Sequence, residues 1–177
     1  MRILVVCTGN LCRSPMATAL LRHEITTREC NDVEVVSAGT WAAGGSPATS
    51  EAVRVLSDRG IDLSPHRSRP LEAEEARSSD LIVAMTSVHV REVLELAPEA
   101  APRIVLLKEL CEMHPDQVPG DATRRDRLGA LLAAARPALR RDLDVDDPMG
   151  LPAGAYERCA GDLERGVQAL VKALCPT

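Results

Sequence analysis

The sequence predicts an α/β fold, with a four-stranded parallel sheet and helices on both faces, in a single-domain three-layer sandwich over residues 1–177. The first observation is that short runs rich in Val, Ile and Leu alternate along the chain with segments of helical periodicity. The second is that these runs are apolar, as expected for strands that a parallel sheet buries on both faces. The third is the length of 177 residues, which suits one domain with a sizeable core.

The expected elements alternate from the N-terminus onward. A strand at 2–6 precedes the first helix. Ser14 is expected to cap this helix, with Pro15 at its first position, and the helix should end near Arg28. A second strand at 33–37 runs into a glycine-rich loop at 38–47. The later elements are a helix around 52–56 that Gly60 ends, a short helix at 70–77, strands at 80–85 and 103–107, and helices at 88–96 and 152–174.

Residues 7–13, CTGNLCR, connect the first strand to the first helix and have the pattern of an anion site. A loop this short before a helix N-terminus turns several backbone N–H groups toward one point, where the helix dipole is positive. Arg13 adds a planar guanidinium that can bind a phosphate through two hydrogen bonds. Cys7 would lie beneath the anion, in a field that favours the nucleophilic thiolate. The alternative is a tight turn with a buried structural cysteine.

The segment CTGNLCRSP after a strand resembles the signature of the low-molecular-weight protein tyrosine phosphatases. Neighbouring branches of that family are the bacterial protein arginine phosphatases and the thioredoxin-linked arsenate reductases. The resemblance implies a phosphatase without a cofactor, which takes the phosphoryl group of a phosphorylated protein onto Cys7 and then passes it to water. It also implies a phosphate-binding loop that holds phosphate or another oxyanion and consists of Thr8, Gly9, Asn10, Leu11, Cys12, Arg13 and Ser14.

The resemblance also implies a general acid late in the chain. The family has an Asp-Pro pair before its last helix, and this chain has DPMG at 147–150, with Tyr156 further on. Asp147 would then protonate the leaving oxygen. Taken alone, Asp-Pro is a common turn dipeptide. Asp144 and Asp146 are expected to be solvated, although they lie close enough to favour protonation of Asp147.

Other residues match the family's supporting network. Asn10, which tolerates a left-handed backbone, and Ser14 match residues that hold the loop and hydrogen-bond the thiolate. Ser37 and His66 match residues that brace this asparagine, although a histidine in a polar loop is usually a surface residue. Cys12 either forms a reversible disulfide with Cys7, which shields it from over-oxidation, or packs behind the loop.

Three side chains bear on the substrate. Leu11 lies where tyrosine-specific members have a branched apolar residue and arginine phosphatases have threonine, so it favours phosphotyrosine. Two observations favour phosphoarginine instead. Met149 follows Asp-Pro, where the family often has an aromatic residue that forms a wall for the phenol ring. Much of the remaining chain also resembles the arginine-phosphatase branch. Trp41 restores an aromatic wall if its loop reaches the cleft. Phosphotyrosine in proteins is the expected substrate, and phosphoarginine is the alternative.

Two further alternatives belong to other classes of protein. An arsenate reductase would need a further cysteine pair near the third strand, and residues 80–91 contain no cysteine. A phosphate-binding module without activity would be expected to lack one of the three reactive residues, whereas Cys7, Arg13 and Asp147 are all present.

Composition restricts the partners and the location. The chain has 21 basic and 26 acidic residues, a net charge of −5, no Phe, one Trp and one Tyr. No nucleic-acid or membrane partner is therefore expected, and the core should be aliphatic. Met1 leads directly into a strand, no apolar run is long enough to span a bilayer, and Cys7 must be reduced. These features predict a cytoplasmic protein.

Residues 114–144 form a helical insertion, longer than the resembling family usually carries and interrupted by Pro137. Its arginines could form a surface for a protein partner or substrate, and the alternative is a solvated amphipathic excursion. Cys111-x-x-His114 contains metal-ligand residue types, but no second pair completes a zinc site, so no metal is expected. The arginines of the insertion are Arg124, Arg125, Arg127, Arg136, Arg140 and Arg141.

Overall fold

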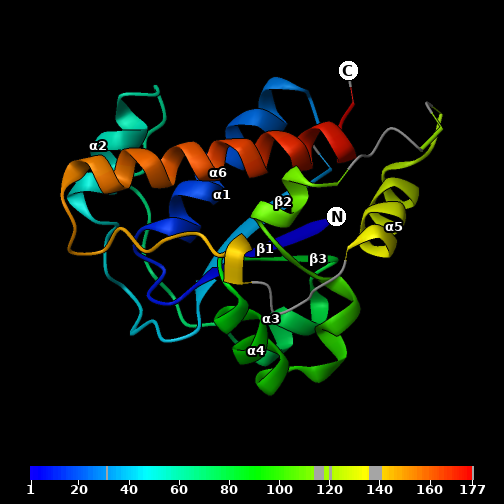
Figure 1. Ribbon diagram of the computed structural model, residues 1–177, viewed down its shortest axis with the longest axis horizontal. Helices are drawn as coiled ribbons and strands as arrows, with labels where there is room; N and C mark the ends of the chain where they lie inside the picture. The colour runs from blue at the N-terminus through cyan, green and yellow to red at the C-terminus, as the bar shows by residue number, and fades with distance from the viewer. Residues whose placement is uncertain (31, 114–117, 120, 136–140, 177) are drawn as a thin grey trace.

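The computed structural model describes residues 1–177 except 31, 114–117, 120, 136–140 and 177. Figure 1 shows a sheet between two helical layers, with α1, α2 and α6 on one face and α3 and α4 on the other. The strands are β1 Arg2–Cys7, β2 Glu34–Gly39, β3 Leu81–Ala84 and β4 Ile104–Leu106. The α-helices are α1 Arg13–Thr27, α2 Ser50–Ser57, α3 Ala73–Ser78, α4 Ser87–Leu96, α5 Arg124–Ala134 and α6 Ala153–Leu174. Short 3-10 helices are η1 Pro98–Arg103, η2 Lys108–Cys111 and η4 Arg141–Leu143.

The sheet has four parallel strands in the order β2-β1-β3-β4, which confirms the predicted fold class. Strand β1 lies in the middle, with Cys7 opposite Gly39 of β2 and Val6 opposite Ala84 of β3. Because parallel strands end at the same edge, the segments that follow β1, β2 and β3 meet there.

Strand β1 explains why both faces of the sheet are covered. Alternate side chains of a strand point to opposite faces. Ile3 and Val5 belong to the core formed with α1, α2 and α6, whereas Leu4 and Val6 belong to the core formed with α3 and α4. All four side chains are at most 1% exposed, so the apolar residues of β1 are buried equally on both faces of the sheet.

The first helix begins at Arg13, and the prediction that Ser14 caps it is wrong. Cys12 precedes the helix and provides no side-chain cap, while Pro15 is its third residue. The Ser14 hydroxyl instead contacts Cys7 and Asn10 within the loop. The short helix α3 also begins later than the predicted residue 70, because Pro70 pairs with Gly39 and the backbone N–H of Leu71 donates to the Gly39 carbonyl.

The described part of residues 114–144, the predicted insertion, contains the helix α5 and the short η4. Thr123 and Asp126 close the first turn of α5 with a capping box. Figure 1 places α5 beside the start of β1 and not beside its end. Arg124 pairs with Asp32 and so connects α5 to the segment between α1 and β2. Arg127 donates to the Pro119 carbonyl, which is a contact within residues 114–144. Four residues of the earlier predictions, His114, Arg136, Pro137 and Arg140, lie outside the described residues.

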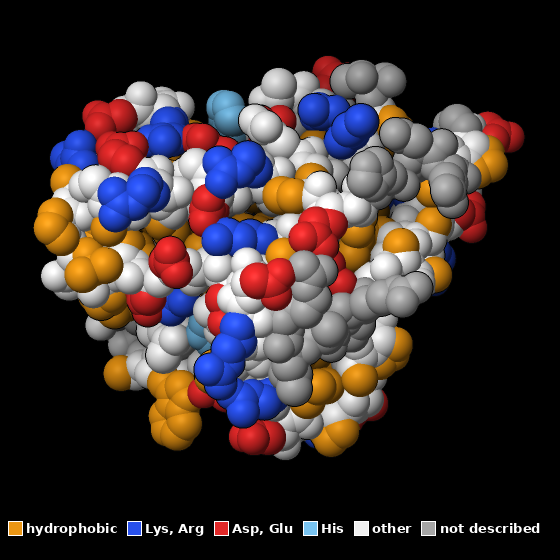
Figure 2. Space-filling model, viewed as in Figure 1, with side chains coloured by type: hydrophobic (Ala, Val, Ile, Leu, Met, Phe, Trp, Pro, Cys, Tyr) orange, Lys and Arg blue, Asp and Glu red, His pale blue; other side chains and the backbone are white. Residues whose placement is uncertain are grey.

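Cys30, just after α1, and Cys175, just after α6, form a disulfide that the sequence analysis missed. The two cysteines are 145 residues apart, so their pairing depends on the packing of α1 against α6. No helix in the described part of the chain is both long and apolar enough to cross a bilayer. Figure 2 shows basic and acidic side chains interspersed on one face of the molecule, in accord with the modest net charge.

Candidate active site

The predicted phosphate-binding loop, residues 8–14, is held against the segment that follows β2. The N–H groups of Thr40 and Trp41 donate to the carbonyls of Cys7 and Thr8, each at 2.9 Å. Gly39 permits this approach, because a Cβ atom on it would lie 2.5 Å from the Thr8 carbonyl oxygen and 2.9 Å from the Asn10 nitrogen. The carboxyl ends of β1 and β2 therefore define the floor of the site.

The Cys7 sulfur lies at the end of β1, 2.9 Å from Ser14 Oγ. Asn10 Nδ2 donates to the same Ser14 oxygen at 2.9 Å, which leaves the Ser14 hydroxyl proton free to donate to the sulfur. Such a donor stabilises a thiolate, and so does the adjacent N-terminus of α1. Cys7 is 2% exposed, so the surrounding residues bury it almost completely.

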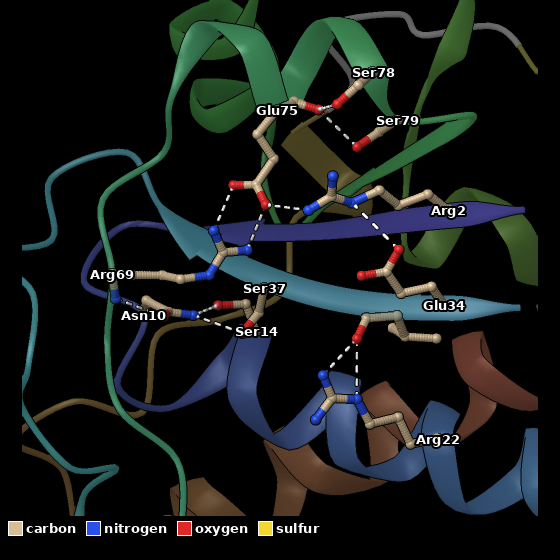
Figure 3. Close-up of polar contacts among 11 residues, drawn as sticks. Arg2, Asn10, Ser14, Arg22, Glu34, Ser37, Arg69, Glu75, Ser78 and Ser79 are labelled. Carbon is tan, nitrogen blue, oxygen red and sulfur yellow. Dashed lines mark hydrogen bonds and ion pairs between the residues drawn. The ribbon is translucent and has the colours of Figure 1, made fainter.

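Asn10 is the centre of the network that shapes the loop (Figure 3). Its backbone is left-handed, with φ of 54°. Its Nδ2 atom also donates to Ser37 Oγ at 2.9 Å, and its Oδ1 atom accepts from the Arg69 N–H at 3.1 Å. His66 Nε2 lies 2.8 Å from the Asn10 carbonyl oxygen, which can only accept, so Nε2 is the donor. Four residues from three segments, namely α1, β2 and the connection between α2 and α3, thus fix one loop residue.

Burial lowers the pKa of His66, and the positive charges of Arg22, Arg67 and Arg69 act in the same direction, although the bond to Asn10 opposes them. A neutral ring with its proton on Nε2 is therefore the form that contacts the loop. The predicted supporting residues Ser37 and His66 both lie next to Asn10.

Glu75 of α3 supports this network from behind and was missed by the sequence analysis. Its carboxylate is 7% exposed and accepts from Arg69 Nη1 and Nη2 at 2.7 and 2.6 Å and from Arg2 Nη2 at 3.0 Å (Figure 3). A buried carboxylate needs such partners. Through Arg69, whose N–H donates to Asn10, α3 is connected to the loop.

Arg13 and Asp147 meet although 134 residues separate them. Arg13 Nη2 lies 2.5 Å from Asp147 Oδ2, and Arg13 Nη1 donates to the Val145 carbonyl at 3.2 Å. The Arg13 side chain is 6% exposed and that of Asp147 is 47% exposed, so the carboxylate lies at the mouth of the site above the guanidinium. The segment before α6 therefore covers the phosphate-binding loop.

Asp144 is only partly exposed and is hydrogen-bonded to another residue, whereas the prediction placed it in solvent. Its carboxylate accepts from the Ser87 N–H at 2.6 Å and from Ser87 Oγ at 3.3 Å. It thereby binds the first residue of α4, where an acidic group is favourable. This contact ties the segment that carries Asp147 to the end of β3. Asp146, by contrast, is exposed as predicted.

The residues predicted to form the substrate wall differ in position. The Trp41 backbone lies on the loop, but its side chain is 76% exposed and donates from Nε1 to Glu92 of α4 at 2.6 Å. Met149 is 45% exposed, and its N–H donates to Asp147 Oδ1 at 3.2 Å. Leu11 is partly buried within the loop itself, beside Gly9.

Cys12 and Cys7 are both free thiols. The Cys12 sulfur lies 3.5 Å from Thr49 Oγ1 and 3.7 Å from Tyr156 Oη, behind the loop. Burial raises the pKa of the Cys12 thiol, which decreases the fraction of nucleophilic thiolate.

His89 of α4 is a second residue that the sequence analysis missed. Its Nε2 atom lies 2.9 Å from Thr8 Oγ1. The available signal was position, because His89 follows the carboxyl end of β3, the edge at which parallel sheets bind ligands.

The described residues contain no group of three or more His, Cys, Asp or Glu side chains that could hold a metal ion. What the site offers instead is a sulfur nucleophile, a guanidinium and a helix N-terminus around one loop, with a carboxylate above. These groups can bind a tetrahedral oxyanion and accept a phosphoryl group on sulfur.

Comparisons with known proteins agree with this geometry. The family model described as low molecular weight phosphotyrosine protein phosphatase matches residues 2–121. A protein-arginine-phosphatase of Geobacillus stearothermophilus is 36% identical over 173 residues, covering 98% of this chain and 95% of that protein. The low molecular weight protein-tyrosine-phosphatase Etp of Escherichia coli (strain K12) is 33% identical over 172 residues, covering 97% and 93%. The crystal structure of a low molecular weight protein tyrosine phosphatase from T. tengcongensis is similar with a TM-score of 0.76 at 34% identity, covering 97% of this chain and 98% of that one.

Proposed function

The chain belongs to the low molecular weight phosphotyrosine protein phosphatase family, and from that premise we propose that it hydrolyses phosphotyrosine in proteins through a phosphocysteine intermediate. Phosphoprotein substrates and oxyanion binding are typical of this family. The observation that carries the proposed mechanism is the placement of the Cys7 sulfur beside Ser14, at the base of a loop whose Arg13 meets Asp147.

In the first step, the phosphate dianion binds to the loop amides and to the Arg13 guanidinium, in place of the Asp147 carboxylate. The Cys7 thiolate attacks phosphorus, so that a sulfur–phosphorus bond forms and the phosphorus–oxygen bond to the leaving group breaks. Asp147, in its acid form, gives its proton to the leaving oxygen, because a phenolate of pKa about 10 is otherwise a poor leaving group.

In the second step, water replaces the product alcohol. Asp147, now a carboxylate, takes a proton from this water as its oxygen attacks phosphorus and the sulfur–phosphorus bond breaks. The electron pair returns to Cys7 as a thiolate, which the Ser14 hydroxyl stabilises. Inorganic phosphate leaves, and no metal or organic cofactor enters either step.

Leu11 is the observation that favours phosphotyrosine over phosphoarginine. It lies within the loop and is partly buried, and we infer that its apolar side chain lines the space beside the group attached to phosphorus. Two other large apolar side chains, Met149 at 45% and Leu151 at 52% exposure, follow Asp147 in the sequence. A phenyl ring gains free energy from such contacts, whereas a charged guanidinium gains little.

Phosphoarginine is the second candidate, and two observations support it. A protein-arginine-phosphatase is among the relatives, at 36% identity over nearly the full length. No aromatic residue follows Pro148, because Met149 occupies that position.

The deciding experiment compares kcat/KM for a phosphotyrosine peptide and a phosphoarginine peptide of the same sequence. We expect phosphotyrosine to be preferred by wild type, and Leu11→Thr to shift the ratio toward phosphoarginine by about tenfold. Leu132→Thr in α5 is the matched control, since it makes the same change at the other end of the sheet. A wild-type preference for phosphoarginine would overturn the substrate proposal, and a Cys7→Ser variant that retains turnover would overturn the mechanism.

A further inference from the structure

His89 contacts the phosphate-binding loop from α4, and the mechanism above does not use it. Its Nδ1 atom lies 2.8 Å from Thr86 Oγ1, and its Nε2 atom lies 2.9 Å from Thr8 Oγ1. Thr8 Oγ1 also accepts from Arg13 Nη2 at 3.3 Å. These contacts form one chain, from Thr86 through His89 and Thr8 to the guanidinium that binds the phosphate.

Counting donors and acceptors assigns the ring tautomer. Thr86 Oγ1 accepts from the His89 backbone N–H at 3.4 Å, so the Thr86 hydroxyl proton needs another acceptor. An unprotonated Nδ1 supplies this acceptor and leaves the ring proton on Nε2. In the opposite tautomer, the Thr86 proton has no acceptor among the described residues.

The Nε2–H tautomer also determines the direction of the Thr8 hydroxyl. Thr8 Oγ1 then accepts both from His89 Nε2 and from Arg13 Nη2, which uses its two lone pairs. Its own proton has no acceptor within the described part of the chain and can be donated to an oxyanion in the loop. Thr8 is exposed, so its hydroxyl is accessible at the mouth of the site.

The surroundings keep the ring neutral. His89 is 2% exposed, and burial together with the charge of Arg13 lowers its pKa from 6.5 to about 3. A protonated ring would have no acceptor site left and would add a positive charge beside the guanidinium.

We propose that His89 is a positioning residue, which orients the Thr8 hydroxyl through Nε2–H and, through Thr8, holds the Arg13 guanidinium against the phosphoryl oxygens. The inference rests on the proposed phosphatase mechanism. Negative charge on these oxygens is stabilised most strongly when the donors are already oriented, so the main effect should fall on kcat and not on KM.

The test is a double-mutant cycle on Thr8→Val and His89→Leu, assayed with p-nitrophenyl phosphate so that it does not depend on the preferred natural substrate. Each single variant should lower kcat about tenfold, with KM changed less than about threefold. Because both residues act through one chain, the double variant should be no slower than the slower single variant. His89→Gln, which retains a neutral N–H donor, should recover part of the loss. His23→Leu, on the exposed surface of α1, is the control and should match wild type.

Nitrogen-15 NMR of the wild-type imidazoles supplies a readout independent of turnover, and it should find the proton of His89 on Nε2 at pH 7. A proton on Nδ1, a Thr8→Val variant with wild-type kcat, or single effects that multiply in the double variant would overturn the proposal. If His89→Leu does not fold, Thr8→Val and the wild-type NMR decide. A wild-type protein inactive on aryl phosphates would refute the proposed function, whereas an active one with unchanged Thr8→Val kinetics refutes this inference alone.

Discussion

The buried neutral histidine makes the stability of the protein depend on pH in a way that can be calculated. His89 has a pKa of about 3 in the folded protein and 6.5 as an ordinary histidine. Between these values the unfolded chain binds a proton that the folded chain excludes, so acid favours unfolding. The stability that His89 contributes is complete above pH 6.5 and is lost as the pH falls toward 3.

The magnitude follows from linkage, at about 1.4 kcal/mol for each pH unit below 6.5. Between pH 7 and pH 5, protonation of His89 in the unfolded chain should therefore lower the free energy of unfolding by about 2 kcal/mol. His66, whose pKa is also lowered, changes stability in the same direction. A comparison of wild type with His89→Gln cancels the contribution of His66, because both chains contain that residue.

The assay is urea denaturation of both proteins at pH 7, 6 and 5. Circular dichroism is the suitable probe, because Trp41 is 76% exposed and its fluorescence would respond weakly to unfolding. The difference in unfolding free energy between wild type and His89→Gln should shrink by about 2 kcal/mol from pH 7 to pH 5. If that difference stays constant across the range, His89 is not held neutral and the reasoning from its burial is wrong.

Two further predictions concern the acid and the floor of the site. Asp147→Asn should lower kcat for phosphotyrosine by about 10²-fold or more. The loss should be smaller for an aryl phosphate with an acidic leaving group, because that group needs less help from a proton donor. Equal losses for both substrates would contradict the role of Asp147 as acid. Gly39→Ala should cost about 1–3 kcal/mol in urea denaturation and also lower kcat, because the new Cβ would lie 2.5 Å from the Thr8 carbonyl oxygen. The control is Gly129→Ala in α5, where an added Cβ would meet no atom within 4 Å. Equal stability of the two variants would contradict the predicted clash at Gly39.

Local sequence determined the elements and the chemistry of the loop. The spacing of apolar residues in 2–6, 80–85 and 152–174 is visible in each segment by itself. A strand or helix buries its apolar face, and the side chains of that same segment determine which face is apolar. The spacing of Cys7 and Arg13 likewise lies within one short connection, so the anion site could be predicted from it. The resemblance to a known family added Asp147 and the residues around Asn10.

Only the tertiary structure decided which distant polar groups meet. Asp144 was expected in solvent, but the order of the strands brings it to the first residue of α4. His89 meets Thr8 because β1 and β3 end at the same edge of the sheet. Glu75 meets Arg2, at the start of β1, and Arg69 because α3 packs against β1. A histidine on a helix has the same local pattern whether it faces solvent or a loop. Its environment depends on strand order and register, which arise from packing over the whole chain and not from its sequence neighbours.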